Sequence, residues 1–409
     1  MSDVRKLFNG ELDDGLNAEL QSVLQKQIID NESPGHILKN IERLIEAIGT
    51  GMPTTSAYYA LPQGKLIELN LSLSQPLTHD LKRPQLRSFP ILAGLFSLLR
   101  GSGLAVGETK PRRIVKIDPV MFDRFSAMNA TERYMNLLST WFYEAGLECI
   151  GETSRRFGGR GMIADIRNVY MYLEQPVTSI IDNRSGIVFG IRDASILGLM
   201  HQFGWIRLTY DKKPAAGKTA SMRRIERTKL GDAMFAATCQ LKHILEERSE
   251  NLREQLGPFF PEWKLDWTEP ELEYRDGEHT FKVAIGDAWR RIVAPASADL
   301  DELANAILNA YRFDNSHLYQ YKLFDRRGHA INILGPELDD GEHFTDEMRI
   351  GELPMLIGDS IVFHYDFGDD WMFKVTLESI DEKPSRKNKM KVTAKSGDAP
   401  KQYDNSDWP

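Results

Sequence analysis

Apolar residues recur at spacings of three and four in the first part of the chain. Between residues 15 and 50 this spacing predicts two helices, because positions three and four apart share one face of a helix. The pair Pro34-Gly35 separates the two helices, and Gly51 ends the pattern. We therefore predict a helical N-terminal region over residues 1–80.

An internal repeat with an offset of 101 residues follows this region. Leu95–Leu104 aligns with Ile196–Trp205, and in each copy an amphipathic helix ends in Gly103 or Gly204. Each copy continues with a strand, a loop rich in Gly, Lys and Pro, a second strand and a closing helix. Helix, strand, loop and strand form the back half of a winged-helix unit. The predicted tandem winged-helix-like domains span residues 81–150 and 151–250.

Beyond residue 250 the pattern changes from helical to alternating. Pro and Trp concentrate in a predicted linker, and two predicted hairpins then enclose a helix and a further strand. This order predicts an α+β domain with an antiparallel sheet, so the whole chain is predicted to be multidomain α+β. The predicted segments are the linker 251–278, the C-terminal domain 279–409, the hairpins His279–Ile285 with Ala288–Ile292 and Ser360–Phe367 with Trp371–Ile380, the helix Asp299–Tyr311 and the strand His317–Phe324.

The composition of the chain is typical of a globular protein without a disulfide framework or a membrane segment. The 409 residues are 42% hydrophobic and 27% charged, which provides apolar material for several cores. Cys149 and Cys239 lie 90 residues apart, with neither a metal-ligand spacing nor a disulfide framework. The polar start and the absence of a long apolar run predict a cytoplasmic protein without a membrane segment. A net charge of −8 argues against wholesale coating of nucleic acid but leaves room for a local basic surface.

Three segments of the C-terminal region carry a resemblance to a known family. They are Ser316–Leu323, Phe363–Trp371 and Gly397–Tyr403. These segments resemble the plasmid pRiA4b ORF-3-like family, whose members commonly carry a Tyr-Asp-Phe-Gly-Asp-Asp-Trp block. The resemblance covers roughly residues 279–403 and implies an α+β domain, often carried by plasmids and mobile elements, without an established reaction. Many members have His two residues after the Trp, where this chain has Phe373.

The block itself predicts an aromatic core face and an acidic turn. Strand alternation places Phe363, Tyr365 and Phe367 on one face and His364 and Asp366 on the other. Four residues there could hold a divalent cation such as Mg²⁺ or Ca²⁺, which would relieve repulsion between the carboxylates. A carboxyl of raised pKa could instead act as a general acid or base. The simplest alternative is turn chemistry, in which the side chains of Asp369 and Asp370 cap backbone N–H groups while Asp366 faces water. The four candidates are His364, Asp366, Asp369 and Asp370.

Other chemistry-bearing residues show weaker patterns. No phosphate-binding loop, nucleophile elbow or paired-cysteine zinc motif occurs. The histidines at positions 317, 329 and 343 have no ligand spacing, and the Gly-rich stretch 158–161 has no strand leading into it. We expect surface or core roles for these histidines and a flexible loop for the Gly-rich stretch.

The second winged-helix-like domain carries the basic wing. Residues 207–229 contain eight positive side chains against two acidic ones, enough to neutralise several phosphates. The corresponding recognition helix, Ser195–Phe203, has no Arg, Lys or Asn for reading base edges. Any DNA contact is therefore expected to be made to the backbone with weak sequence specificity. The predicted nucleic-acid-binding residues are Lys212, Lys213, Lys218, Arg223, Arg224 and Arg227.

These observations favour one function and leave two alternatives. The favoured function is an accessory nucleic-acid-associated protein of a plasmid or mobile element. The first alternative is a protein-interaction adaptor that makes no nucleic-acid contact. The second is a metal-dependent enzyme that uses the acidic hairpin at residues 364–370. The sequence predicts no cofactor apart from that divalent cation.

Overall fold

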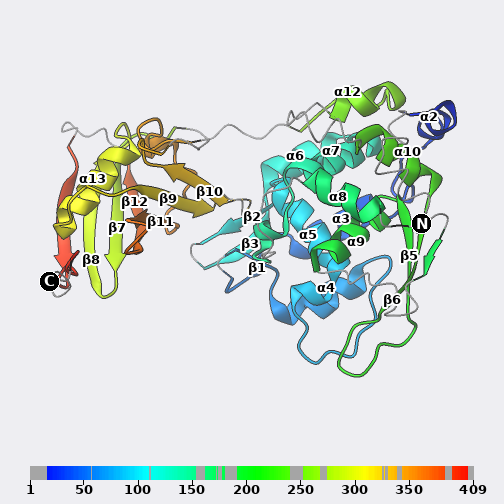
Figure 1. Ribbon diagram of the computed structural model, residues 1–409, viewed down its shortest axis with the longest axis horizontal. Coiled ribbons are helices and arrows are strands. Elements are labelled where there is room, and N and C mark those ends of the chain that lie inside the picture. Colours follow the sequence, from blue (N-terminus) through cyan, green and yellow to red (C-terminus); the bar gives the residue numbers. More distant parts are fainter. Residues whose placement is uncertain are drawn as a thin grey trace. The chain divides into compact units, whose positions relative to one another are not determined.

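The computed structural model describes residues 16–56, 58–109, 112–152, 162–171, 173, 177–179, 191–239, 252–267, 274–324, 327, 330–338, 343–382 and 389–403. The chain divides into an N-terminal unit, residues 1–107 and 114–269, and a C-terminal unit, residues 108–113 and 270–409. Helices and antiparallel sheets occur together, so the predicted multidomain α+β class is confirmed (Figure 1). Within the described ranges, no helix is long and apolar enough to cross a membrane. The Gly-rich stretch 158–161 and His329 lie outside the described residues.

The N-terminal unit is mostly helical and carries two small sheets. Its strand orders are β1-β3-β2 and β4-β6-β5. The two helices predicted before residue 50 are present as α2 and α3, and the predicted break at Pro34-Gly35 lies between them. The elements are α2 (Ala18–Gln25), α3 (Ile37–Ile48), β1 (Met52–Pro53), α4 (Leu66–Ser72), α5 (Pro90–Gly101), β2 (Ala105–Glu108), β3 (Ile114–Ile117), α6 (Pro119–Ala127), α7 (Ala130–Tyr143), α8 (Met162–Met171), β4 (Val177–Ser179), α9 (Ile191–Gln202), β5 (Ile206–Tyr210), β6 (Met222–Arg227), α10 (Lys229–Thr238) and α12 (Leu252–Leu256).

The two helices of the internal repeat, α5 and α9, pack against each other in the core of this unit. Glycines allow the close approach: a Cβ on Gly94 would lie 2.8 Å from Cγ of Leu199, and one on Gly198 would lie 3.2 Å from Cγ1 of Ile91. Every residue from 195 to 203 is buried, including the polar His201 and Gln202. The segment predicted as a recognition helix is therefore enclosed by protein and presents no face to a DNA groove.

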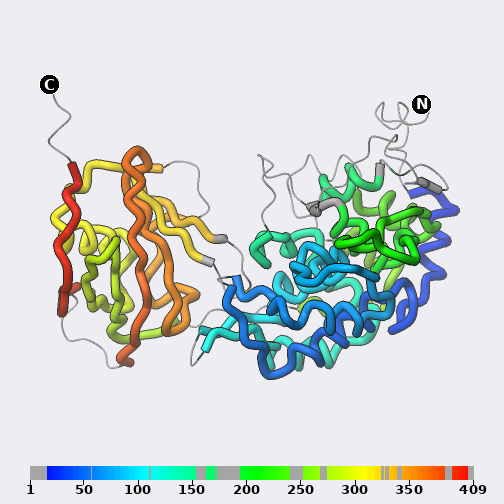
Figure 2. The backbone as a smooth tube through the Cα atoms, turned by 90° about the horizontal axis from the view of Figure 1, so that it is seen from below, coloured from blue at the N-terminus to red at the C-terminus, as the bar shows by residue number. Residues whose placement is uncertain are grey.

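Among its described residues, the C-terminal unit is a seven-stranded antiparallel sheet with one α-helix. The strand order is β10-β9-β11-β12-β7-β8-β13, and β13 forms one edge (red in Figures 1 and 2). Both predicted hairpins, the predicted helix and the predicted strand are present, with ends shifted by a few residues. The elements are β7 (Glu278–Ile285), β8 (Ala288–Pro295), α13 (Leu300–Tyr311), β9 (Tyr319–Phe324), β10 (Ala330–Leu334), β11 (Ser360–Tyr365), β12 (Trp371–Asp381) and β13 (Lys391–Ser396). Short 3-10 helices of the whole chain lie at Gln63–Lys65, Leu86–Ser88, Leu147–Ile150, Gly257–Phe259 and Ile350–Glu352.

Strand alternation divides this sheet into a buried and an open face. α13 lies across one face (Figure 1), and its apolar side joins the aromatic rings of β9, β11 and β12 in a single core. Phe363, Tyr365 and Phe373 are fully buried there, as predicted. The prediction for Phe367 is wrong, because this ring is 43% exposed. β11 ends at Tyr365, and the positive φ of Asp366 (54°) breaks the alternation before Phe367 is reached.

His279 is a buried titratable residue on the core face of β7. It is 1% exposed, and neither ring nitrogen has a hydrogen-bond partner among the described residues. Burial, and then the neighbouring charge of Arg275, lower the pKa of His279 to about 4. The fold therefore holds this imidazole in its neutral form.

The α5–α9 contact predicts a sharp response to side-chain volume at Gly94. Gly94→Val should lower the free energy of unfolding by about 1–3 kcal/mol, because the new methyl groups overpack against Leu199. Chemical unfolding would measure the change. Gly64→Val is the control, since nothing lies within 4 Å of a Cβ at that position. An equal loss in both variants would contradict the close approach of the helices.

Acidification should destabilise the C-terminal unit through His279. The folded pKa lies below the unfolded value, so the unfolded chain binds more protons between pH 6.5 and 4. Stability should fall as the pH drops through this window, by at most about 3 kcal/mol, and level off below it. An NMR titration of the His279 ring should give a midpoint near 4. His279→Phe should flatten the pH dependence of the unfolding free energy, and the control His343→Gln should not. An NMR midpoint near 6.5 for His279 would show that burial does not lower its pKa.

Candidate functional site

The basic wing is the loop between β5 and β6, residues 211–221, together with the start of β6. Lys212, Lys213 and Lys218 are exposed in this loop, and none of them forms an ion pair among the described residues. Arg223 and Arg224 are exposed at the start of β6 and contact Asp211 and Glu226 respectively. Five of the six predicted residues therefore lie at the surface of one hairpin.

The sixth residue, Arg227, is engaged inside the domain. Its Nε lies 2.7 Å from Oδ1 of Asp232, and its guanidinium carbon lies 4.7 Å from the centre of the Tyr170 ring. The side chain is only 17% exposed. These contacts fasten β6 to α8 and α10, a structural role that competes with binding phosphate.

A second chain segment stabilises the wing. Residues 78–80 pair with residues 218–220: Ala220 N donates to Thr78 O at 2.8 Å, and Asp80 N donates to Lys218 O at 2.8 Å. Exposed Lys82 and Arg83 follow, at most about 11 Å of extended chain beyond Asp80. Pairing between segments about 140 residues apart leaves no local signal in the sequence.

The acidic block of the C-terminal unit forms a tight turn. Asp366 Oδ1 accepts hydrogen bonds from the backbone N–H of Gly368 at 3.0 Å and of Asp369 at 3.3 Å. Asp370 N donates to the backbone oxygen of Asp366 at 2.7 Å. A side chain therefore caps backbone N–H groups in this turn, but the capping residue is Asp366 and not Asp369 or Asp370 as expected. The expectation that Asp366 faces water is wrong, because Asp366 is 8% exposed.

The four candidate metal ligands do not converge on one point, because His364 and Asp366 contact different residues. His364 Nε2 lies 2.7 Å from Oδ1 of Asp370, although outside hydrogen-bond alignment, while Asp366 Oδ2 lies 3.4 Å from Nδ1 of His317. Burial, and then the charge of Lys322 3.4 Å away, lower the pKa of His364, and Asp370 partly offsets this. Across the described residues, no group of three or more His, Cys, Asp or Glu is arranged to hold a metal ion.

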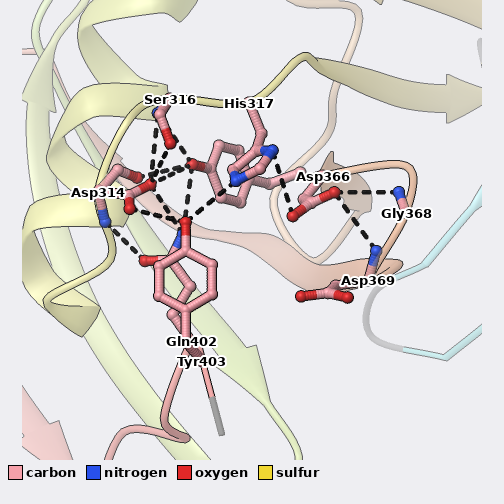
Figure 3. A network of polar contacts seen from close by, with 9 residues as sticks. Asp314, Ser316, His317, Asp366, Gly368, Asp369, Gln402 and Tyr403 are labelled. Atoms are coloured by element: carbon pink, nitrogen blue, oxygen red, sulfur yellow. Dashed lines mark hydrogen bonds and ion pairs between the residues drawn. The ribbon is translucent and has the colours of Figure 1, made fainter. Parts of the chain in front are cut away.

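Asp314 is the centre of a larger polar network that sequence patterns did not single out (Figure 3). Its Oδ1 accepts hydrogen bonds from Ser316 Oγ at 2.9 Å, Tyr365 OH at 3.0 Å and Gln402 Nε2 at 2.8 Å. Its Oδ2 accepts one from Tyr403 OH at 2.7 Å. The donation from Tyr403, followed by those from Gln402 and Ser316, holds the pKa of Asp314 well below its usual range.

His317 connects this network to the acidic turn. Its Nε2 lies 3.0 Å from Tyr403 OH, and its Nδ1 faces the carboxylate of Asp366 (Figure 3). The hydroxyl of Tyr403 thus lies between the imidazole and Asp314. Hydrogen bonding to Asp314 raises the pKa of Tyr403, which keeps the phenol protonated. The arrangement joins three segments that lie up to 89 residues apart.

Comparison with known proteins gives a family match for the C-terminal unit. Residues 280–403 match the model of a family described as plasmid pRiA4b ORF-3-like protein. The C-terminal unit is a pRiA4b ORF-3-like domain. Among solved structures, the chain is similar to a protein of unknown function, MM3350 from Methanosarcina mazei Go1, with 23% identity over 30% of this chain and 71% of that chain and a TM-score of 0.26. No curated protein matches the chain.

The three segments that carried the resemblance meet in the Asp314 network of the pRiA4b ORF-3-like domain. Ser316 and His317 come from the first segment, Tyr365 and Asp366 from the second, and Gln402 and Tyr403 from the third. The family pattern in this chain therefore coincides with contacts that fasten the residues after β13 to the sheet.

Removing single hydroxyl groups should measure the strength of the network. Tyr403→Phe should lower the free energy of unfolding by about 0.5–1.5 kcal/mol, since one hydrogen bond to Asp314 is lost. Tyr365→Phe should cost more, because its buried hydroxyl donates its hydrogen to Asp314 and also accepts a hydrogen bond from Ser316 N at 3.2 Å. Urea unfolding would compare both with Tyr274→Phe, whose exposed hydroxyl makes no hydrogen bond among the described residues. Equal stability of all three variants would show that the network contributes nothing.

Proposed function

We propose that the protein is a nucleic-acid-associated accessory protein of a plasmid or mobile element that docks on the DNA backbone through its basic wing. The observation that carries the proposal is the charge of the wing loop. Lys212, Lys213 and Lys218 extend into solvent without a carboxylate partner among the described residues. Phosphate oxygens are the ligands that such unpaired cations bind best in DNA.

The arginines of β6 add to this surface. Arg223 and Arg224 are 65% and 52% exposed, and their contacts with Asp211 and Glu226 are ion pairs at the surface. Exposed pairs of this kind contribute about 0–1 kcal/mol, so a phosphate can displace the carboxylate at little cost. Lys82 and Arg83 extend the same surface, since residues 78–80 are hydrogen-bonded to the wing.

The buried helix α9 supports a backbone mode of binding. A winged-helix protein that reads sequence places a recognition helix in the major groove. The described part of α9 packs on α5 instead, and no polar side chain from it reaches solvent. The proposed contact therefore carries little sequence specificity, and it depends on salt because each phosphate contact releases counterions. The plasmid assignment rests on the family of the C-terminal unit.

Reversing the wing charges should weaken binding to duplex DNA. For K212E/K213E/K218E the slope of log Kobs against log salt should become shallower by about 2.7, because each lost phosphate contact contributes about 0.9. Fluorescence anisotropy with an unrelated duplex would measure the slope. The matched control, K26E/K264E/K395E, reverses three exposed lysines outside the wing and should change the slope far less. Absence of duplex binding at low salt would reject the proposal and favour the adaptor alternative.

A further inference from the structure

The open face of the sheet in the C-terminal unit carries a row of side chains that crosses six strands. Register pairs place Asn332, Lys322, Val362, Lys374, Ala284 and Trp289 side by side on β10, β9, β11, β12, β7 and β8 in turn. Their sequence neighbours on the other face are buried in the aromatic core. Because residues opposite each other in an antiparallel pair point to the same side, the whole row faces away from α13.

This row and its neighbour are cationic. Lys322 and Lys374 are two strand spacings apart, about 10 Å. Lys282 lies on the same face, opposite Arg291 on β8 and Thr376 on β12. Within the described part of the chain, none of the three lysine ammonium groups forms an ion pair with a carboxylate, and Lys322 Nζ lies 3.4 Å from Nδ1 of His364. Arg291 differs, because Glu378 neutralises it at 2.5 Å.

An aromatic ring lies at the end of the row. Lys282 Nζ lies 5.2 Å and the guanidinium carbon of Arg291 lies 5.3 Å from the centre of the Trp289 ring. The residues opposite Trp289 on the flanking strands are small, Ala284 on β7 and Ser396 on β13. The tryptophan is half-buried, so part of the ring surface remains open to solvent.

We propose that this open face binds single-stranded nucleic acid, with Lys322, Lys374 and Lys282 contacting phosphates and Trp289 stacking on a base. Cations that lack carboxylate partners and lie together on one sheet face are complementary in charge to a polyanion. Cations interleaved with an aromatic ring are the combination that binds single strands, whose bases are free to stack. A four-stranded sheet with exposed aromatics binds single-stranded RNA in the same way. The surface extends the proposed function and is distinct from the wing, which contacts duplex DNA.

The test uses the full chain with the wing reversed, K212E/K213E/K218E, so that the wing does not contribute. In this background we expect K322E/K374E to weaken binding of a labelled oligothymidine of about 20 nucleotides at least about fivefold and to make the salt slope shallower by about 1.4. Trp289→Ala should weaken binding about fivefold or more. The control K389E/K395E reverses two exposed lysines near the edge strand β13 and should leave binding within about twofold. Lys374 is exposed, so K374E alone replaces the double variant if circular dichroism shows a folding defect in that variant.

The outcomes separate this inference from the proposed function. Unchanged oligothymidine binding after K322E/K374E, or an equal loss in K389E/K395E, would overturn the single-strand surface. Loss of all binding on reversing the wing would also overturn it, because no second surface would then remain. Duplex binding that survives wing reversal while K322E/K374E weakens single-strand binding would reject the wing and support the sheet.

Discussion

The close packing of α5 on α9 determines what the N-terminal unit can offer to a partner. Gly94 and Gly198 remove the side chains that would otherwise separate the two helices, so each helix buries the other. The apolar side chains of one repeat helix are thereby buried against those of the other. The described residues of the two helices offer no exposed face to a DNA groove, so the proposed contact with DNA is made by the wing with Lys82 and Arg83.

Elements fixed by local sequence could be predicted closely. Gly286-Asp287 between two alternating runs predicts the β7–β8 hairpin, and the turn lies at that position. Asp299 begins α13 by accepting a hydrogen bond from Glu302 N at 2.8 Å, which explains why the predicted helix started correctly. The burial of α9 also had a signal, because a helix that is apolar on most sides belongs in a core. The winged-helix assignment of both repeats stays a prediction.

Contacts between distant segments could not be predicted. Asp314 belongs to no motif, and its partners Tyr365 and Tyr403 lie 51 and 89 residues further along the chain. The pairing of residues 78–80 with the wing likewise joins segments that are far apart in the sequence. The errors at Asp366 and Phe367 arose from one backbone angle, because a residue with positive φ reverses the chain where alternation would have continued.

The family block and the proposed binding surface belong to opposite faces of one sheet. Phe373, where many members of the family have His, packs its ring 5.1 Å from Tyr311 and 5.7 Å from Phe313. A histidine at this position would lie in the aromatic core, so the identity of residue 373 affects packing and not the open face. Lys374, the next residue, points to that open face. Strand alternation therefore separates the residues that build the core from the neighbours that form the proposed binding surface, so a sequence pattern carried by the core indicates the fold and says little about function.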